Sequence, residues 1–131
     1  MSRPIISFER LSLPVASLAR SVPFYEELGF TTEIRTDQFC LMRLGAGSVG
    51  LLQVGGATRY AQELSSPLRL LIQVELSTDA LDELYALFLQ KQIPVRVPPR
   101  DRGFERSMQL VDPDGFTVEF AEGQRGHNAT R

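Results

Sequence analysis

Residues 11–30 read LSLPVASLARSVPFYEELGF, a strand pattern that passes directly into a helix pattern. Leu11, Leu13 and Val15 alternate with serine and proline, as the side chains of a half-buried strand do. This alternation places one apolar face of the strand against a core. We expect the strand to span residues 5–15.

The helix that follows has two candidate N-caps, Ser17 and Ser21, because a serine hydroxyl accepts hydrogen bonds from the first helical turn. Pro23 favours Ser21, since proline is tolerated in a first turn and breaks a later one. Gly29 is placed to end the helix, because glycine readily adopts the positive φ found there. The segment therefore predicts a short helix that stops at Gly29.

The strand-to-helix pattern occurs twice along the chain. After the first helix, short strands are expected over residues 30–35, 39–44 and 48–54. The second copy predicts a strand over residues 69–76, a helix from Ser77 or Thr78 to about residue 91, and strands over residues 94–97, 106–111 and 116–121. Residues 98–104 are interpreted as a charged, proline-rich loop. Each copy thus has the order β-α-β-β-β.

A strong turn signal separates the last two predicted strands. The string Asp112-Pro113-Asp114-Gly115 combines a proline that presets φ, aspartates that bond nearby amides and a glycine that accepts positive φ. The two flanking strands should therefore form a hairpin.

These patterns predict an α+β fold in which two βαβββ modules form an incompletely closed barrel around a cleft. Each half is too small to bury its sheet alone, so the two sheets should combine. We expect one domain over residues 1–131, with module one at about residues 5–56, module two at about residues 68–122, and a loose tail over residues 123–131.

The composition excludes several classes of protein and site. The 131 residues carry a formal net charge of −2, which gives no attraction to nucleic acid. No run approaches the ~20 apolar residues that cross a membrane, and the N-terminus does not read as a signal peptide, so we expect a cytoplasmic protein. The single cysteine, Cys40, excludes an intrachain disulfide, and the single histidine, His127, excludes a multi-histidine metal site within one chain.

Residues 11–30 and the string DPDGFTVEF at residues 112–120 resemble the vicinal oxygen chelate superfamily, which includes glyoxalase I, extradiol dioxygenases and bleomycin-resistance proteins. The first stretch is similar to the superfamily's first strand and helix, and the second to its final hairpin. The resemblance covers nearly the whole chain and implies paired modules around a small-molecule cavity, often in a homodimer. Enzymes of this superfamily usually hold one divalent metal as a Lewis acid.

The resemblance also implies where metal ligands would stand. Those positions are taken by Arg10, Leu51, Gln73 and Glu119, or by Gln53 and Leu71 if a strand is shifted by two. Glu119 is a good ligand and Gln73 a weak one, whereas an arginine has no lone pair to donate. We therefore expect no cofactor; a divalent metal, if bound, would be held by Glu119 and Gln73.

Two interpretations of Arg10 remain open. In the first, Arg10 and Glu119 face each other across the cleft, and the guanidinium neutralises the carboxylate and fills the space of a metal. In the second, Arg10 points to solvent at a strand end, since a slip of one residue reverses the face of a strand.

The leading functional interpretation is a metal-independent small-molecule binder similar to the bleomycin-resistance branch. Its ligand would be anchored by Arg10, Gln73, Gln109 and Glu119. The alternative is a metal-dependent lyase, isomerase or dioxygenase of the glyoxalase type that uses Glu119 and Gln73. A third is a scaffold without a small-molecule site.

Three further features belong to these hypotheses. Cys40 is interpreted as a small buried hydrophobe, because no histidine stands near it to activate a thiol. Ser107 alternates with core residues and is a candidate for the cavity wall. Residues 100–106 either close over the ligand, bringing Phe104 and an arginine with them, or form a solvated loop.

Overall fold

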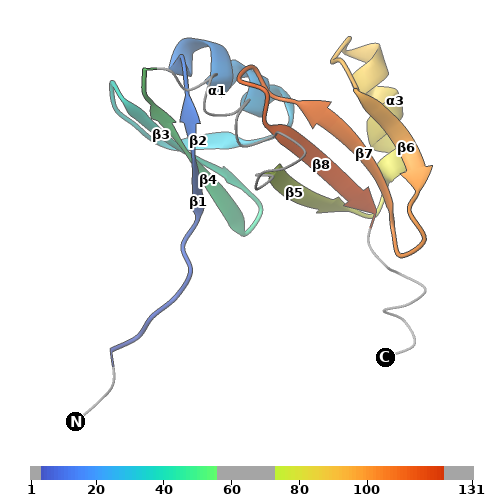
Figure 1. Ribbon diagram of the computed structural model, residues 1–131, viewed down its shortest axis with the longest axis horizontal. Coiled ribbons are helices and arrows are strands. Elements are labelled where there is room, and N and C mark those ends of the chain that lie inside the picture. Colours follow the sequence, from blue (N-terminus) through green and yellow to red (C-terminus); the bar gives the residue numbers. More distant parts are fainter. Residues whose placement is uncertain (1–3, 56–72, 123–131) are drawn as a thin grey trace. The chain divides into compact units, whose positions relative to one another are not determined.

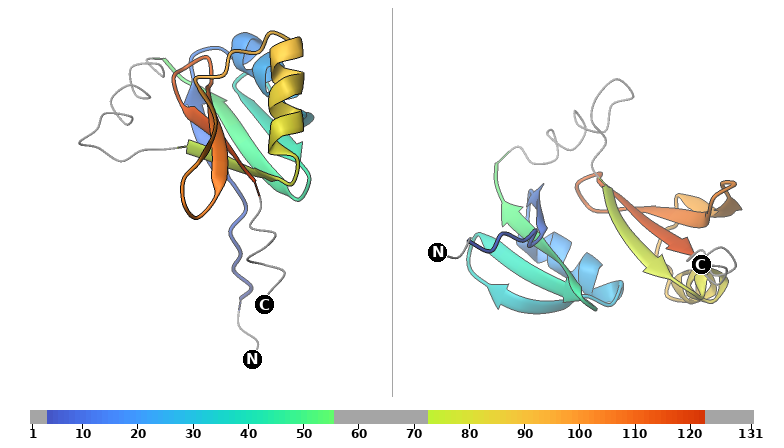
Figure 2. Two further views of the ribbon diagram at one scale, coloured as in Figure 1. Left: turned by 90° about the vertical axis from the view of Figure 1, so that its right-hand side faces the viewer. Right: turned by 90° about the horizontal axis from the view of Figure 1, so that it is seen from below.

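The structure is a computed structural model that describes residues 4–55 and 73–122. The chain divides into two compact units, an N-terminal unit (Met1–Tyr60) and a C-terminal unit (Ala61–Arg131), and each is described by itself. Both units have the order β-α-β-β-β, with one helix packed on one face of a four-stranded sheet (Figures 1 and 2). Neither sheet closes on itself. The predicted α+β fold with two βαβββ modules is therefore confirmed, whereas their union into one domain around a cleft stays a prediction.

The N-terminal unit places its first strand at the edge of the sheet. Its elements are β1 (Leu11–Val15), α1 (Leu18–Glu27), β2 (Thr31–Arg35), β3 (Phe39–Leu44) and β4 (Gly47–Gln53). The sheet has the order β1-β4-β3-β2, in which β1 runs parallel to β4 and the other pairs are antiparallel. Helix α1 contacts β3 and β4. The core lies between α1 and the sheet and includes Leu13, Val15, Tyr25, Met42 and Leu51.

Two expectations for this unit are wrong at their N-terminal boundaries. Strand β1 begins at Leu11 and not at residue 5, because Leu11 pairs with Val49 and β4 begins only two residues earlier. The N-cap position of helix α1 is Ser17, whose hydroxyl makes no capping hydrogen bond, and not the preferred Ser21, so Pro23 lies inside the helix. Proline costs the helix one backbone hydrogen bond, and the burial of one apolar face of α1 against the sheet offsets that loss. The predicted end is confirmed, since Gly29 follows the helix with φ of 109°.

The C-terminal unit repeats this topology. Its elements are β5 (Gln73–Thr78), α3 (Leu81–Gln90), β6 (Val97–Asp101), β7 (Arg106–Val111) and β8 (Thr117–Glu122). The sheet order is β5-β8-β7-β6, with β5 parallel to β8. Helix α3 contacts β6, β7 and β8, and the ring of Phe88 packs edge-on against Phe120 at 5.3 Å.

Two expectations for the C-terminal unit are also wrong. The N-cap position of helix α3 is Ala80 and not Ser77 or Thr78, because β5 continues through those two residues. Strand β6 occupies much of the segment interpreted as a loop, since proline is tolerated in an edge strand and a bulge separates Val97 from Arg100. The part of the predicted strand at residues 69–72 lies outside the described residues.

The hairpin turn between β7 and β8 forms as predicted. One carboxylate oxygen of Asp112 accepts hydrogen bonds from the backbone N–H groups of Asp114, Gly115 and Phe116 at 2.8–3.0 Å. Gly115 has φ of 105°, which favours glycine. This turn fixes the register in which β8 presents Glu119.

A bidentate ion pair joins α3 to β7. The guanidinium of Arg106 donates from Nη1 and Nη2 to the two carboxylate oxygens of Asp82, at 3.0 and 3.1 Å. This hydrogen bonding lowers the pKa of Asp82 below its ordinary value. A carboxyl whose pKa is lower in the folded state stabilises the fold above its unfolded pKa, and that contribution is lost as the pH falls through the folded pKa.

We therefore expect Asp82→Asn to lower the melting temperature at pH 7, by an amount that shrinks toward zero below about pH 3. Thermal melts of both proteins across this pH range measure the difference. Glu83→Gln is the matched control, because Glu83 lies in the same first turn of α3. An Asp82→Asn effect that is equal at pH 7 and at pH 2.5 would contradict this assignment.

Within the described ranges, no helix is both long and apolar enough to span a membrane.

Candidate functional site

The face of each sheet that its helix does not cover is called here the helix-free face. In the C-terminal unit, Gln109 of β7 pairs with Glu119 of β8, which pairs with Glu75 of β5. These residues alternate with Met108, Leu110, Val118 and Phe120, which are buried. Because successive side chains of a strand point to opposite faces, the polar row lies on the helix-free face. Gln73 lies on the same face of β5 as Glu75, and its Nε2 donates a hydrogen bond of 2.9 Å to Glu75 Oε1.

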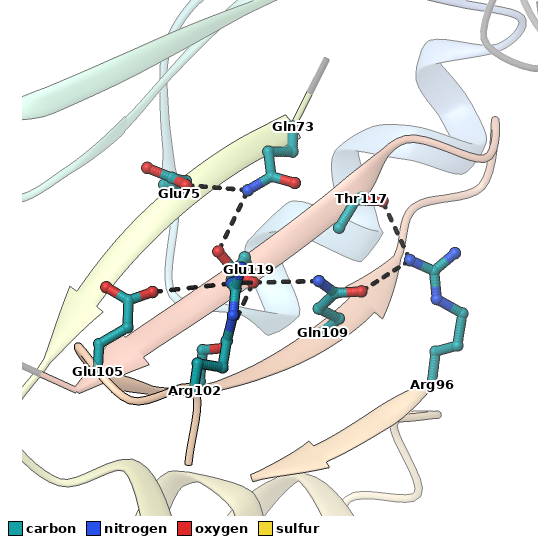
Figure 3. Close-up of polar contacts among 9 residues, drawn as sticks. Gln73, Glu75, Arg96, Arg102, Glu105, Gln109, Thr117 and Glu119 are labelled. Atoms are coloured by element: carbon teal, nitrogen blue, oxygen red, sulfur yellow. Dashed lines mark hydrogen bonds and ion pairs between the residues drawn. The ribbon is translucent and has the colours of Figure 1, made fainter. Parts of the chain in front are cut away.

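Glu119 is the centre of this face, and its side chain is 1% exposed. Its Oε1 accepts from Arg102 Nη1 at 2.8 Å, from Gln109 Nε2 at 3.1 Å and from Ser107 Oγ at 3.4 Å. Its Oε2 accepts from Gln73 Nε2 at 3.2 Å (Figure 3). A carboxylate has about four lone-pair sites, so the donors of its own unit satisfy this buried charge.

Arg102 is the cation that neutralises Glu119. It lies in the turn between β6 and β7, and its side chain stays 33% exposed. Its guanidinium also lies 3.9 Å from Glu105 and 5.3 Å from the centre of the Phe104 ring. Residues 100–106 thus place Arg102 next to Phe104, and the ion pair with Glu119 holds Arg102 in this position.

Arg96 occupies the other end of the polar row, just before β6. Its Nη2 donates to Gln109 Oε1 at 2.9 Å and to Thr117 Oγ1 at 3.2 Å (Figure 3). The amide of Gln109 thus presents its carbonyl to Arg96 and its NH₂ group to Glu119. This orientation links Arg96 to the buried carboxylate through a single side chain.

Sequence reasoning found Gln73, Gln109 and Glu119 but missed Arg96 and Arg102. The resemblance to the superfamily located Gln73 and Glu119, and alternation along the strand located Gln109. Arg102 lies within residues 98–104, which were interpreted as a loop because of their prolines, and Arg96 lies two residues before this segment. The signal that could have located Arg96 was its position within the strand predicted over residues 94–97, which had to pair with β7.

Arg10 lies in the N-terminal unit, where its guanidinium stacks over the ring of Phe39 at 5.5 Å. Arg10 is exposed. Its proposed pairing with Glu119 would join the two units and stays a prediction. Within its own unit, Glu119 has Arg102 as its partner.

In the N-terminal unit, the position that corresponds to Glu119 is Gly50. Gly50 pairs with Ser12 as Glu119 pairs with Glu75, and Ser12 stands two residues after Arg10 as Glu75 stands two after Gln73. A Cβ added to Gly50 would lie 2.6 Å from Ser12 Oγ and 2.8 Å from Phe39 Cε1. A carboxylate side chain therefore has no room at this position unless Phe39 and Ser12 move.

The expected ligand positions Leu51 and Gln53 are corrected by this register. Leu51 pairs with the core residue Leu13 and is buried toward α1. Gln53 Oε1 accepts a hydrogen bond of 2.8 Å from the backbone N–H of Leu18, the first residue of α1. Both side chains thus lie on the helix-covered face, the face of the sheet that packs against α1. The sequence-based expectation failed because counting along β4 without its pairing partners does not determine the face.

The described residues of the C-terminal unit do not fit a divalent metal as they stand. No group of three or more His, Cys, Asp and Glu side chains gathers in the described part of the chain. The guanidinium of Arg102 lies against the carboxylate that a metal would need, and Gln73 directs its NH₂ group toward Glu119. Leu71 and His127 lie outside the described residues.

Cys40 is a free thiol that is buried on the helix-covered face, as predicted. Its Sγ lies 3.7 Å from Thr32 Oγ1. This environment is that of a small packing residue, so Cys40 takes no part in the candidate site.

The comparison with protein families decides the classification. The model of the Glyoxalase/Bleomycin resistance protein/Dioxygenase superfamily matches residues 7–120. The chain belongs to this superfamily. No curated protein matches the chain in sequence.

Solved structures of the superfamily fold are similar to the chain over most of its length. A bleomycin-binding protein complexed with bleomycin has a TM-score of 0.68 at 21% identity and covers 90% of this chain and 99% of its own. TnmS3, an antibiotic binding protein from Streptomyces sp. CB03234, has a TM-score of 0.70 at 21% identity, with 92% and 98% covered. Lactoylglutathione lyase from Agrobacterium tumefaciens has a TM-score of 0.69 at 20% identity, with 92% and 96% covered. The superfamily fold thus accommodates both binding proteins and an enzyme.

Proposed function

We propose that this superfamily member binds a small molecule without the divalent metal that many of its relatives use. The observation that carries the proposal is the Arg102–Glu119 ion pair at 2.8 Å, in which the buried carboxylate already has a cation. A metal at Glu119 would have to displace a charge-assisted hydrogen bond and would then lie beside a guanidinium of like charge. The crowding at Gly50 removes room for a second carboxylate in the N-terminal unit.

The antibiotic-binding proteins among the similar structures support a binding role for the fold. We further propose that the protein acts as a homodimer in the cytoplasm, and that Arg10, Gln73, Gln109 and Glu119 contribute to ligand binding. Glu119 acts there as the fixed charge that orients Gln73, Gln109 and Arg102, rather than as a free ligand-binding carboxylate.

A metal-dependent lyase, isomerase or dioxygenase is the second candidate function. One observation favours it, because Gln73 Nε2 bridges Glu75 and Glu119 at 2.9 and 3.2 Å and so brings two carboxylates to one face. This function requires Arg102 to leave Glu119. The two candidates therefore differ in whether Arg102 prevents metal binding.

Metal titration separates them. We expect an excess of Mg²⁺, Mn²⁺, Fe²⁺, Co²⁺, Ni²⁺ or Zn²⁺ to shift the melting temperature of the wild-type protein by less than about 1 °C, because an ion that does not bind the folded state does not stabilise it. Arg102→Gln is the matched variant, since it frees the carboxylate of its cation. A stoichiometric metal that raises the wild-type melting temperature by several degrees, and no longer does so in Glu119→Gln, would contradict the metal-free proposal and favour the metal-dependent candidate.

A further inference from the structure

Among the described residues, the cation that ends the polar row of the C-terminal unit has no anionic partner. No carboxylate among residues 4–55 and 73–122 lies within ion-pair distance of the Arg96 guanidinium, whose side-chain partners there are the neutral Gln109 and Thr117. Arg102 differs, because Glu119 neutralises it. Glu75, at the far end of the row, lies on β5, and the order β5-β8-β7-β6 puts two strands between it and β6.

The guanidinium of Arg96 is also held in one orientation. Both side-chain hydrogen bonds that Arg96 makes within residues 4–55 and 73–122 start from Nη2, so Nη1 and Nε have no partner among those residues. Arg96 is exposed, so these two hydrogen bonds place its guanidinium at the surface of the sheet, within reach of a ligand. Gln109 is itself oriented by Glu119, so the buried carboxylate fixes the position of Arg96 indirectly.

We propose that Arg96 binds an anionic group of the ligand, such as a carboxylate, sulfonate or phosphate, on the helix-free face of the C-terminal unit. The inference rests on the proposed binding function and specifies its ligand class. Because Nη2 already donates to Gln109 and Thr117, the N–H groups of Nη1 and Nε are the donors that can each form a charge-assisted hydrogen bond with an oxygen of such a group. Gln109 is a positioning residue in this arrangement, because it holds Arg96 through its carbonyl oxygen.

Two dyes with one aromatic skeleton test the proposal. The probe 8-anilinonaphthalene-1-sulfonate carries the anionic group, and N-phenyl-1-naphthylamine lacks it. Fluorescence titration of each dye into wild type, Arg96→Gln and Arg35→Gln gives the dissociation constants. Arg35→Gln is the matched control, because this substitution removes the same charge from an exposed position on β2 of the other unit.

We expect Arg96→Gln to weaken binding of the sulfonate dye about tenfold or more, the range of a charged hydrogen bond, and to change binding of the neutral dye less than about twofold. Arg35→Gln should leave both dyes unaffected. Saturable binding of both dyes with no loss in Arg96→Gln would overturn this inference and leave the proposed function intact. If neither dye binds the wild-type protein saturably, the proposed function and the inference both fail.

Discussion

Glu119→Gln is expected to lower the free energy of unfolding by about 3 kcal/mol. The substitution keeps the shape of the side chain but removes the charge that accepts hydrogen bonds from Arg102, Gln109 and Gln73. The new NH₂ group also faces donors where an acceptor stood. Arg102 keeps a third of its side chain exposed and regains water, so the loss stays near the lower end of the range for a broken buried ion pair.

Urea unfolding of wild type, Glu119→Gln and Glu75→Gln measures this loss. Glu75→Gln is the matched control, because Glu75 is the strand partner of Glu119, carries the same group and is exposed. We expect the control to change the free energy of unfolding by less than about 0.5 kcal/mol. Equal effects at the two positions would show that Glu119 is not the centre of the network.

Gly50→Ala is expected to cost about 2 kcal/mol, because an overpacked site forces its neighbours to shift. The added methyl group would lie 2.8 Å from Phe39 Cε1 and 2.6 Å from Ser12 Oγ. The serine hydroxyl is able to rotate away, whereas the ring of Phe39 also carries the stacked guanidinium of Arg10. The predicted cost therefore arises mainly from Phe39.

A double-mutant cycle isolates this contact. Gly47→Ala is the control in the same strand, since its added Cβ meets one backbone oxygen at an ordinary 3.7 Å. Phe39→Leu should recover more than half of the Gly50→Ala loss when the two changes are combined. If Phe39→Leu and Gly50→Ala destabilise additively, the close contact at Gly50 does not control the packing of this face.

The alternation of apolar and polar residues predicted most of the strands, and the resemblance to the superfamily pointed to Gln73 and Glu119. Strands β3 and β7 have the predicted bounds, and Glu119 accepts hydrogen bonds from Gln73 and Gln109. Pairing between strands is a non-local property, so the face of Leu51 was not determined until β4 was paired with β1. The period-two pattern thus divided the residues of each strand between two faces. It did not show which residues of neighbouring strands lie side by side.

Other features depend on tertiary packing that overrides local preference. Pro23 argued for a later helix start, yet the buried face of α1 extends back to Leu18. Pro98 and Pro99 argued for a loop, yet an edge strand accommodates both of them. The arginines that complete the site, Arg96 and Arg102, flank those prolines, and for that reason the sequence alone did not associate them with Glu119.

The glycine at position 50 also constrains how this sequence is able to evolve. A glutamate introduced there, in the place that corresponds to Glu119, meets Phe39 and Ser12 at its first side-chain carbon. A smaller residue at position 39 relieves that contact, although on its own it removes packing. The effect of a carboxylate at position 50 on stability therefore depends on which residue stands at position 39, so the two positions are epistatic.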